Sequence, residues 1–121
     1  MTTYFISGHL DLTEEEFTEH YAREILHAME EGALFVLGEA RGCDYLAQRV
    51  LGLLYPIRKV TVFHMFTAPR NLAAPFNLMG GFQSDDERDA AMTAASDKDI
   101  AWVRPGREKS GTAKNLARRD A

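Results

Sequence analysis

Short continuous runs of apolar residues alternate along this chain with longer segments in which apolar residues recur at helical spacing. The runs at 3–7, 33–37, 59–63 and 99–103 are too short for helices and are rich in β-branched and aromatic residues. They predict four buried strands. The continuous apolar character of the run at 33–37 is typical of a strand covered on both faces, as in a parallel sheet.

The segments between these runs predict four helices. Thr13 and Glu16 have the spacing of a capping box, and apolar residues from Phe17 onward lie on one face, which predicts a helix over 13–31. A second helix is expected from Asp44 to Leu54. A third begins after Ser84, which has the chemistry of an N-cap, and runs towards Ala95. A last, basic helix is expected over 113–119.

Strands and helices therefore alternate through the whole chain. This order predicts the α/β class, with a three-layer Rossmann-like parallel sheet, helices on both faces and a single domain over 1–121. The segment 67–83 has no regular pattern and contains two prolines and two adjacent glycines. We expect it to be an irregular loop that is functional or mobile.

Composition narrows the class of protein. With 121 residues, 45% of them hydrophobic, the chain can form one compact core, and its net charge of −4 disfavours a protein that coats nucleic acid. From Arg104 onward, however, the chain has six basic residues and only two acidic ones. This end therefore either binds an anion or is a solvated tail. Cys43 is the single cysteine, which points to a reducing compartment. We expect a cytoplasmic protein without a membrane segment.

Three turns rich in small residues follow predicted strands: Ser7-Gly8-His9, the segment from Gly38 to Asp44, and the segment from Pro105 to Thr112. The carboxyl ends of parallel strands meet at one edge of a sheet, so these turns should lie together. Backbone N–H groups and helix N-termini at such an edge suit a phosphate. The alternative is that the glycines only permit tight turns between strand and helix.

The stretch G-E-A-R-G-C-D-Y-L-A, residues 38–47, resembles the G-x-A-x-G-x-D-x-L-A signature of the SLOG superfamily, a Rossmann-like group that includes DprA and the LOG enzymes. The closest branch is that of the short, single-domain YspA-like proteins. The later S-G-T-A at 110–113 is similar to the second phosphate-binding turn of the superfamily, and Pro69-Arg70-Asn71 is similar to an R-N element of the YspA-like branch. The resemblance implies a nucleotide or nucleotide-derived ligand bound across the two turns.

One departure from the LOG pattern G-G-x-G-T-x-x-E affects the expected chemistry. Asn115 stands where the LOG enzymes carry their catalytic Glu, and an amide cannot act as a carboxylate base. A deoxyribosyltransferase-like reaction would need another carboxylate, from Glu39, Asp44 or the acidic run 85–87. The catalytic residues are therefore unknown. Three classes stay open: a nucleotide-binding or sensing module, an enzyme of the nucleotide N-glycosidic bond, and a DprA-like nucleic-acid-binding protein, which we expect least.

The predicted ligand-binding residues come from the three turns and from the segment after the third strand. Arg70 is expected to close over the ligand, because a guanidinium grips phosphate at two points. The full set is Ser7, Gly8, His9, Gly38, Glu39, Ala40, Gly42, Asp44, Arg70, Asn71, Ser110, Gly111 and Thr112.

Other candidates carry less weight. His64 also follows a strand and is either a ligand residue or a hydrogen-bonded turn histidine. Glu16, His20, Glu24 and His27 share one helical face, which is better explained as a solvated face than as a metal site. We expect neither a metal nor a cofactor.

The chain carries more apolar side chains around its irregular segments than a small monomer comfortably hides. We therefore expect a homo-oligomer, with a two-fold dimer favoured. The residues concerned are Tyr55, Phe66, Phe76, Leu78, Met79 and Phe82.

Overall fold

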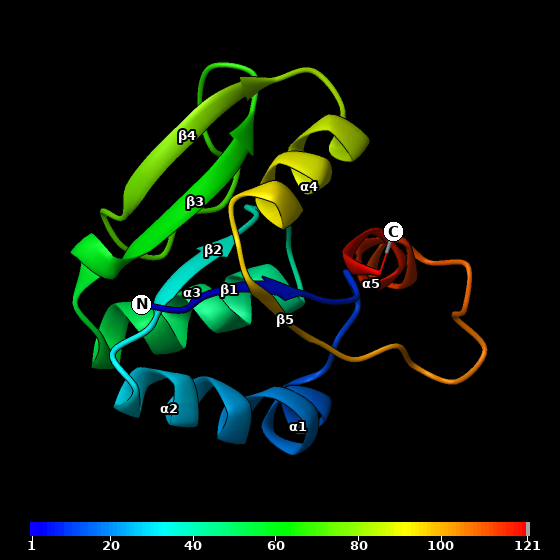
Figure 1. Cartoon of the computed structure of the whole chain (residues 1–121), viewed down its shortest axis with the longest axis horizontal. Helices are drawn as coiled ribbons and strands as arrows, with labels where there is room; N and C mark the ends of the chain where they lie inside the picture. The colour runs from blue at the N-terminus through cyan, green and yellow to red at the C-terminus, as the bar shows by residue number, and fades with distance from the viewer. Residues whose placement is uncertain (121) are drawn as a thin grey trace.

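The computed structural model describes residues 1–120 and contains one five-stranded sheet in which every pair of neighbouring strands is parallel. Its order is β4-β3-β2-β1-β5, which places β1 in the interior and β4 and β5 at the edges (Figure 1). The strands are β1 (Thr3–Ser7), β2 (Leu34–Leu37), β3 (Val60–Met65), β4 (Asn77–Phe82) and β5 (Lys98–Ala101). The predicted parallel α/β sheet is confirmed.

The prediction of an irregular loop over 67–83 is wrong in its second half, which forms β4. This strand pairs with β3 in parallel, and Val62 lies opposite Leu78. Its residues are largely exposed and it contains Gly80 and Gly81, so it lacks the apolar run that indicates a buried strand. Residues 66–76 thus connect two parallel strands without a helix.

The predicted first helix is interrupted by one π-helical turn, so that α1 (Glu14–Phe17), η1 (Thr18–Ala22) and α2 (Arg23–Glu30) follow one another. The capping box is present, since Thr13 and Glu16 exchange hydrogen bonds at 3.0 and 3.1 Å. The other helical segments are α3 (Cys43–Leu54), the 3₁₀ turn η2 (Ile57–Lys59), α4 (Asp85–Ala94) and α5 (Gly111–Arg119).

Successive side chains of the strands enter different apolar clusters. Ile6, Leu37 and Val62 pack in the larger cluster with residues of α2 and α3, whereas their neighbours Phe5, Val36 and Phe63 pack in a smaller cluster with Met92 of α4. Adjacent residues of a strand point to opposite faces, so α3 and α4 contact different faces of the sheet (Figure 1).

The apolar residues expected at an oligomer surface divide between core and surface. Phe76 is buried in the larger cluster, and the Tyr55 hydroxyl donates to the Ala33 carbonyl at 2.7 Å. Phe66, Leu78 and Met79 are exposed. Phe82 is half-buried and stacks on Phe63 with the ring centroids 5.7 Å apart.

Candidate functional site

The direction of the chain across the sheet creates a crevice beside β1. From β1 the chain passes outward through β2, β3 and β4, and then returns by way of α4 to β5 on the other side of β1. Parallel sheets of this kind bind ligands at such a reversal, beyond the carboxyl ends of the strands. A cavity of about 480 Å³ lies there, lined by residues that follow β1 and β2 and by residues of α4 and of the α5 start.

The cavity brings together eight of the thirteen predicted site residues, from all three predicted turns. These are Ser7, Gly8, His9, Ala40, Asp44, Ser110, Gly111 and Thr112. Their role in ligand binding stays a prediction. The other five, which do not line this cavity, are Gly38, Glu39, Gly42, Arg70 and Asn71.

The turn after β1 supplies one side of the cavity. The Ser7 hydroxyl is buried and has no hydrogen-bond partner, which is costly for a polar atom unless a ligand or water reaches it. Gly8 allows the close approach of α3, because a Cβ there would lie only 2.5 Å from the Cys43 sulfur.

His9 has a fixed tautomer. Its Nε2 accepts a hydrogen bond from the Arg104 backbone N–H at 2.9 Å, so a neutral ring carries its proton on Nδ1. Burial, together with the positive charges of Arg104 and Arg107, lowers the pKa of His9. The residue is therefore a neutral hydrogen-bond donor at the cavity wall.

Asp44, in the first turn of α3, supplies a buried carboxyl. It accepts a hydrogen bond from the Ala40 N–H at 3.1 Å, and burial raises its pKa to about 7. Gly38 lies behind this carboxyl, where a Cβ would come within 2.6 Å of Asp44 Oδ2. Gly38 thus makes room for Asp44 rather than for a ligand.

Gly42 also serves the protein's own packing. Its φ of 75° lies in the left-handed region, and a Cβ there would overlap the carbonyl oxygens of His9 and Leu10. The backbone is closely approached at Gly42, and its partner is the chain after β1. This contact holds the start of α3 against the turn after β1, since the Cys43 N–H donates to the His9 carbonyl at 3.1 Å.

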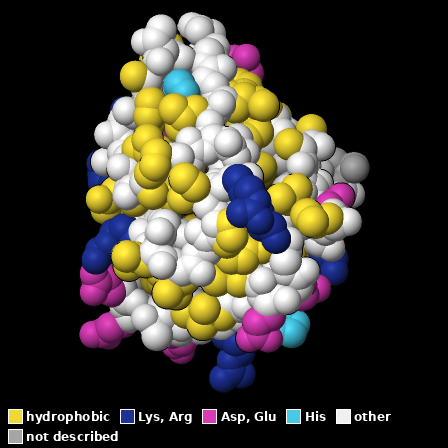
Figure 2. All heavy atoms as spheres, turned by 90° about the vertical axis from the view of Figure 1, so that its left-hand side faces the viewer, with side chains coloured by type: hydrophobic (Ala, Val, Ile, Leu, Met, Phe, Trp, Pro, Cys, Tyr) yellow, Lys and Arg dark blue, Asp and Glu magenta, His cyan; other side chains and the backbone are white. Residues whose placement is uncertain are grey.

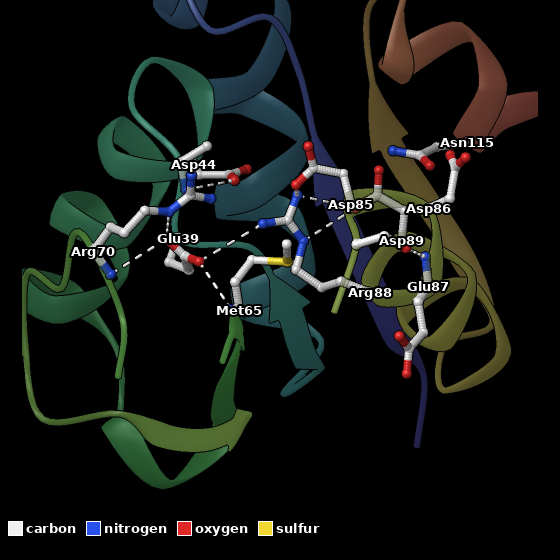
Figure 3. Close-up of polar contacts among 12 residues, drawn as sticks. Glu39, Asp44, Met65, Arg70, Asp85, Asp86, Glu87, Arg88, Asp89 and Asn115 are labelled. Atoms are coloured by element: carbon white, nitrogen blue, oxygen red, sulfur yellow. Dashed lines mark hydrogen bonds and ion pairs between the residues drawn. The ribbon is translucent and has the colours of Figure 1, made fainter. Parts of the chain in front are cut away.

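Arg88 of α4 is the main cavity residue that the sequence did not single out. Its side chain is 8% exposed and lies 3.3 Å from Asp89, 3.4 Å from Asp85 and 3.8 Å from Glu39 (Figure 3). Its Nη1 is buried without a hydrogen-bond partner. In sequence it follows three acidic residues at a helix start, so it resembles an ordinary surface charge. The pairing with a carboxylate distant in sequence cannot be predicted from local pattern.

Asp89, one residue further along α4, gives the cavity a second buried carboxyl. Burial raises its pKa although Arg88 and Asn115 stabilise the charged form. The cavity therefore has two carboxyl groups, Asp44 and Asp89, that hold protons more tightly than usual, beside one buried guanidinium.

The start of α5 forms another part of the cavity wall. Ser110 caps the helix by accepting from the Ala113 N–H at 3.2 Å, and Thr112 and Asn115 are buried while lining the cavity. A helix start carries free N–H groups and the positive end of the helix dipole, which favour an anion. Asn115 thus has a place in the cavity that was not expected for it, and its side-chain oxygen accepts from Arg118.

Arg70 pairs with Glu39 in this structure, and its closure over a ligand stays a prediction. Arg70 Nε donates to the buried carboxylate of Glu39 at 2.7 Å, and the Met65 N–H donates to the same group at 3.0 Å. Burial alone would raise the pKa of Glu39, but these hydrogen bonds outweigh it and the pKa is lowered. Asn71 Nδ2 donates to the Glu39 carbonyl at 3.0 Å. These three residues hold the β3–β4 connection in place and do not line the cavity.

Gln48 completes this support. Its side-chain nitrogen donates to the carbonyls of Gly38 and Asn71 at 3.1 and 3.2 Å, and its oxygen accepts from the Ala73 N–H at 2.9 Å. Buried polar side chains therefore hold the β3–β4 connection, which contains no helix. Glu39 links this connection to the cavity, because it contacts Arg70 on the connection and Arg88 at the cavity.

The remaining candidates have structural partners. His64 Nδ1 lies 3.2 Å from the Met65 carbonyl, and His20 stacks on Trp102 with ring centroids 3.8 Å apart. Burial raises the pKa of the Cys43 thiol. Within residues 1–120, no group of three His, Cys, Asp or Glu side chains has an arrangement suited to a metal ion.

The basic C-terminal segment is partly neutralised within the chain. Arg104 pairs with Asp11 at 3.0 Å and with Glu16 at 2.7 Å, and Arg119 pairs with Asp99 at 3.0 Å. Arg107 and Arg118 pair with Asp11 and Asp86. The pairs of Arg104 and Arg107 tie the segment before α5 to the start of α1, whereas those of Arg118 and Arg119 join α5 to α4 and β5.

Comparison with known proteins adds no family assignment, because no family model, no curated protein and no solved structure matches the chain. In the part of the chain that the structure describes, no helix is both long and apolar enough to cross a membrane.

Proposed function

We propose that this protein binds a nucleotide or a nucleotide-derived ligand in the cavity beside β1. The observation that carries the proposal is the meeting of three features in one cavity: the start of α5, the buried guanidinium of Arg88 and the unpartnered hydroxyl of Ser7. All three favour an anion with hydrogen-bond acceptors. The resemblance to the SLOG superfamily supports the same ligand class.

The proposed ligand has its phosphate at the α5 start and its sugar towards Asp44. Gly111 and Thr112 supply backbone N–H donors for the phosphate, and Ser110 and Thr112 supply hydroxyls, since the Ser110 N–H already donates to the Arg107 carbonyl at 3.0 Å. Carboxyl groups are good acceptors for sugar hydroxyls, and Asp44 and Asp89 provide them inside the same cavity. The neutral His9 adds a donor at the wall. The volume of about 480 Å³ is in the range of small-ligand sites.

The experiment has two steps. Small molecules that co-purify with the protein are identified by mass spectrometry after denaturation, and a panel of nucleoside 5′-phosphates is then tested for thermal stabilisation. We expect at least one member of the panel to raise the melting temperature progressively as its concentration increases, since a ligand that binds only the native state adds to stability with the logarithm of its concentration. Inorganic phosphate and free nucleosides are the controls. A flat response across the whole panel would contradict the proposal.

One observation favours a second candidate, an enzyme that breaks the N-glycosidic bond of a nucleotide. Asp44, whose pKa is about 7, can exist in both protonation states near neutral pH, as general acid–base catalysis requires. Asp89 is a second carboxyl on the same cavity. Release of free base from a nucleoside 5′-phosphate, lost in Asp44→Asn, would establish this activity. Without such release, the binding or sensing role stands alone.

We further propose a cytoplasmic homo-oligomer that does not bind nucleic acid. The free, buried thiol of Cys43 suits a reducing compartment. Arg104, Arg107, Arg118 and Arg119 already pair with acidic side chains, which leaves less positive charge for a phosphate backbone. An oligonucleotide titration at low salt is the direct check, and salt-sensitive binding would count against this proposal.

A further inference from the structure

β4 is an edge strand that lacks the usual protection against pairing with a strand of another molecule. Asn77–Phe82 contains no charged residue and no proline, which are the side chains that commonly block edge strands. Five of its six residues are exposed. A one-residue irregularity relative to β3 falls at Gly80–Gly81, so the segment Asn77–Met79 keeps a regular register.

Exposed apolar side chains surround this edge. Leu78 lies opposite Val62 and so points to the face of the sheet that α3 covers. The end of α3 is close to the beginning of β4, because Gly52 lies against Ala74 and Asn77 Nδ2 donates to the Arg58 carbonyl at 3.0 Å. The exposed apolar residues on these neighbouring segments, together with those of β4, are Leu53, Leu54, Ile57, Leu72, Leu78 and Met79.

Figure 2 shows this side of the molecule. Hydrophobic side chains spread over its central area, charged side chains lie mostly at its margins, and one basic side chain crosses the middle. The six apolar residues expose on the order of 500 Å², more than scattered surface residues usually do and a large part of the roughly 800 Å² per partner in a stable interface.

The charges at the two ends of β4 are opposite. The acidic first turn of α4 follows its carboxyl end with Asp85, Asp86 and Glu87, whereas Arg58 and Lys59 lie beside its amino end. When two such strands run antiparallel about a two-fold axis, the acidic end of each meets the basic end of the other. The edge is thus complementary to a second copy of itself in backbone hydrogen bonds, apolar surface and charge.

We propose that two copies of this chain pair through β4, antiparallel and about a two-fold axis, so that their sheets join into one continuous sheet. The axis passes near Leu78, the middle of the regular segment, and the apolar residues of α3 and η2 cover the junction. Asp85 belongs both to the acidic end of this edge and to the lining of the cavity beside β1, whereas Leu78 does not line the cavity. Substitution of Leu78 therefore tests the dimer separately from the proposed ligand site.

The first test is the mass of the particle in solution. We expect twice the 13.6 kDa of one chain in sedimentation velocity, falling to one chain only on strong dilution. Leu78→Lys should weaken self-association by about a hundredfold or more, because it places two like charges at the axis. Leu26→Lys is the matched control, since Leu26 is 44% exposed, close to the 48% of Leu78, and lies on α2. It should leave the dimer intact.

Two further measurements keep the test decisive. A mixture of Leu78→Lys and Leu78→Glu should dimerise again, since opposite charges then meet at the axis. In the parent, amide exchange over 77–82 should slow as protein concentration rises, whatever the variants do. A monomeric parent at high concentration would overturn the proposal. So would a dimer that survives Leu78→Lys, or exchange over 77–82 that is independent of concentration.

Discussion

Buried ionisable side chains determine the chemistry of the cavity at the scale of single residues. Arg88 lies between Glu39 on one side and Asp85 and Asp89 on the other (Figure 3). Its charge is compensated by carboxylates, as a buried guanidinium requires, yet Nη1 keeps a free donor. A ligand anion would compete with these carboxylates for the same guanidinium, so binding should depend on their protonation.

Asp44 gives a pH-dependent prediction. Its pKa is about 7 in the native state, against an ordinary value of 3.8, so between these values the native state holds the proton that the unfolded chain has lost. The contribution of Asp44 to stability should therefore fall as pH rises from about 4 to 7, by up to a few kcal/mol, and level off above. Unfolding in urea at pH 5 and pH 8 measures this difference, and Asp44→Asn should reduce it. An Asp44 carboxyl that titrates below pH 5 by NMR would contradict the account.

Glu39 gives a stability prediction. Glu39→Gln removes a buried carboxylate from both Arg70 and Arg88, and we expect a loss of about 3 kcal/mol in the free energy of unfolding. The exposed Glu15→Gln should change it by less than about 0.5 kcal/mol. Equal effects of the two substitutions in urea titrations would mean that Glu39 does not hold the β3–β4 connection.

Helix starts show, at the scale of elements, how similar glycine turns perform different tasks. Gly42 at the start of α3 has positive φ and lies against the chain after β1, whereas a Cβ at Gly111 would have no heavy atom within 4 Å. The first glycine serves packing and the second leaves space open at the cavity. From sequence, both turns have the same two interpretations, a phosphate-binding loop or a tight turn between strand and helix.

A pair of substitutions tests this distinction. Gly42→Ala should destabilise the protein by more than about 2 kcal/mol, because it combines backbone strain with overlap on two carbonyl oxygens. Gly111→Ala should be neutral or slightly stabilising, since alanine favours helix over glycine. Thermal unfolding of both variants gives the comparison. A Gly42→Ala variant as stable as Gly111→Ala would show that the close approach at Gly42 is not required.

The predictions of strands and helices were correct where the sequence pattern is local. Apolar runs located β1, β2, β3 and β5, and the capping residues Thr13 and Ser84 located two helix starts, because both signals lie within a few neighbouring residues. The exposed strand β4 has no such signal. Its pairing depends on β3 and on the buried anchors Glu39 and Gln48, which are more than ten residues away in sequence.

At the scale of the whole molecule, parallel alternation predicts that three turns meet at one edge, and the cavity lies at that edge. What sequence could not predict is which side chains of these turns face the cavity. Glu39 and Arg70 contact each other at the β3–β4 connection, and Arg88 enters the cavity from α4, although the sequence did not single it out. Which side chains face the cavity depends on contacts between elements that are distant in sequence.

The central claim is that a nucleotide phosphate binds at the α5 start. The most direct measurement is titration calorimetry of the nucleoside 5′-phosphate that stabilises the parent most, with Gly111→Val and Ala113→Val as a matched pair on α5. A valine at 111 extends into open space at the cavity, whereas residue 113 does not line it. Gly111→Val should lower affinity by about a hundredfold or more with nearly unchanged thermal stability, and Ala113→Val should bind like the parent. Equal affinity of Gly111→Val and the parent would place the ligand elsewhere and contradict this account.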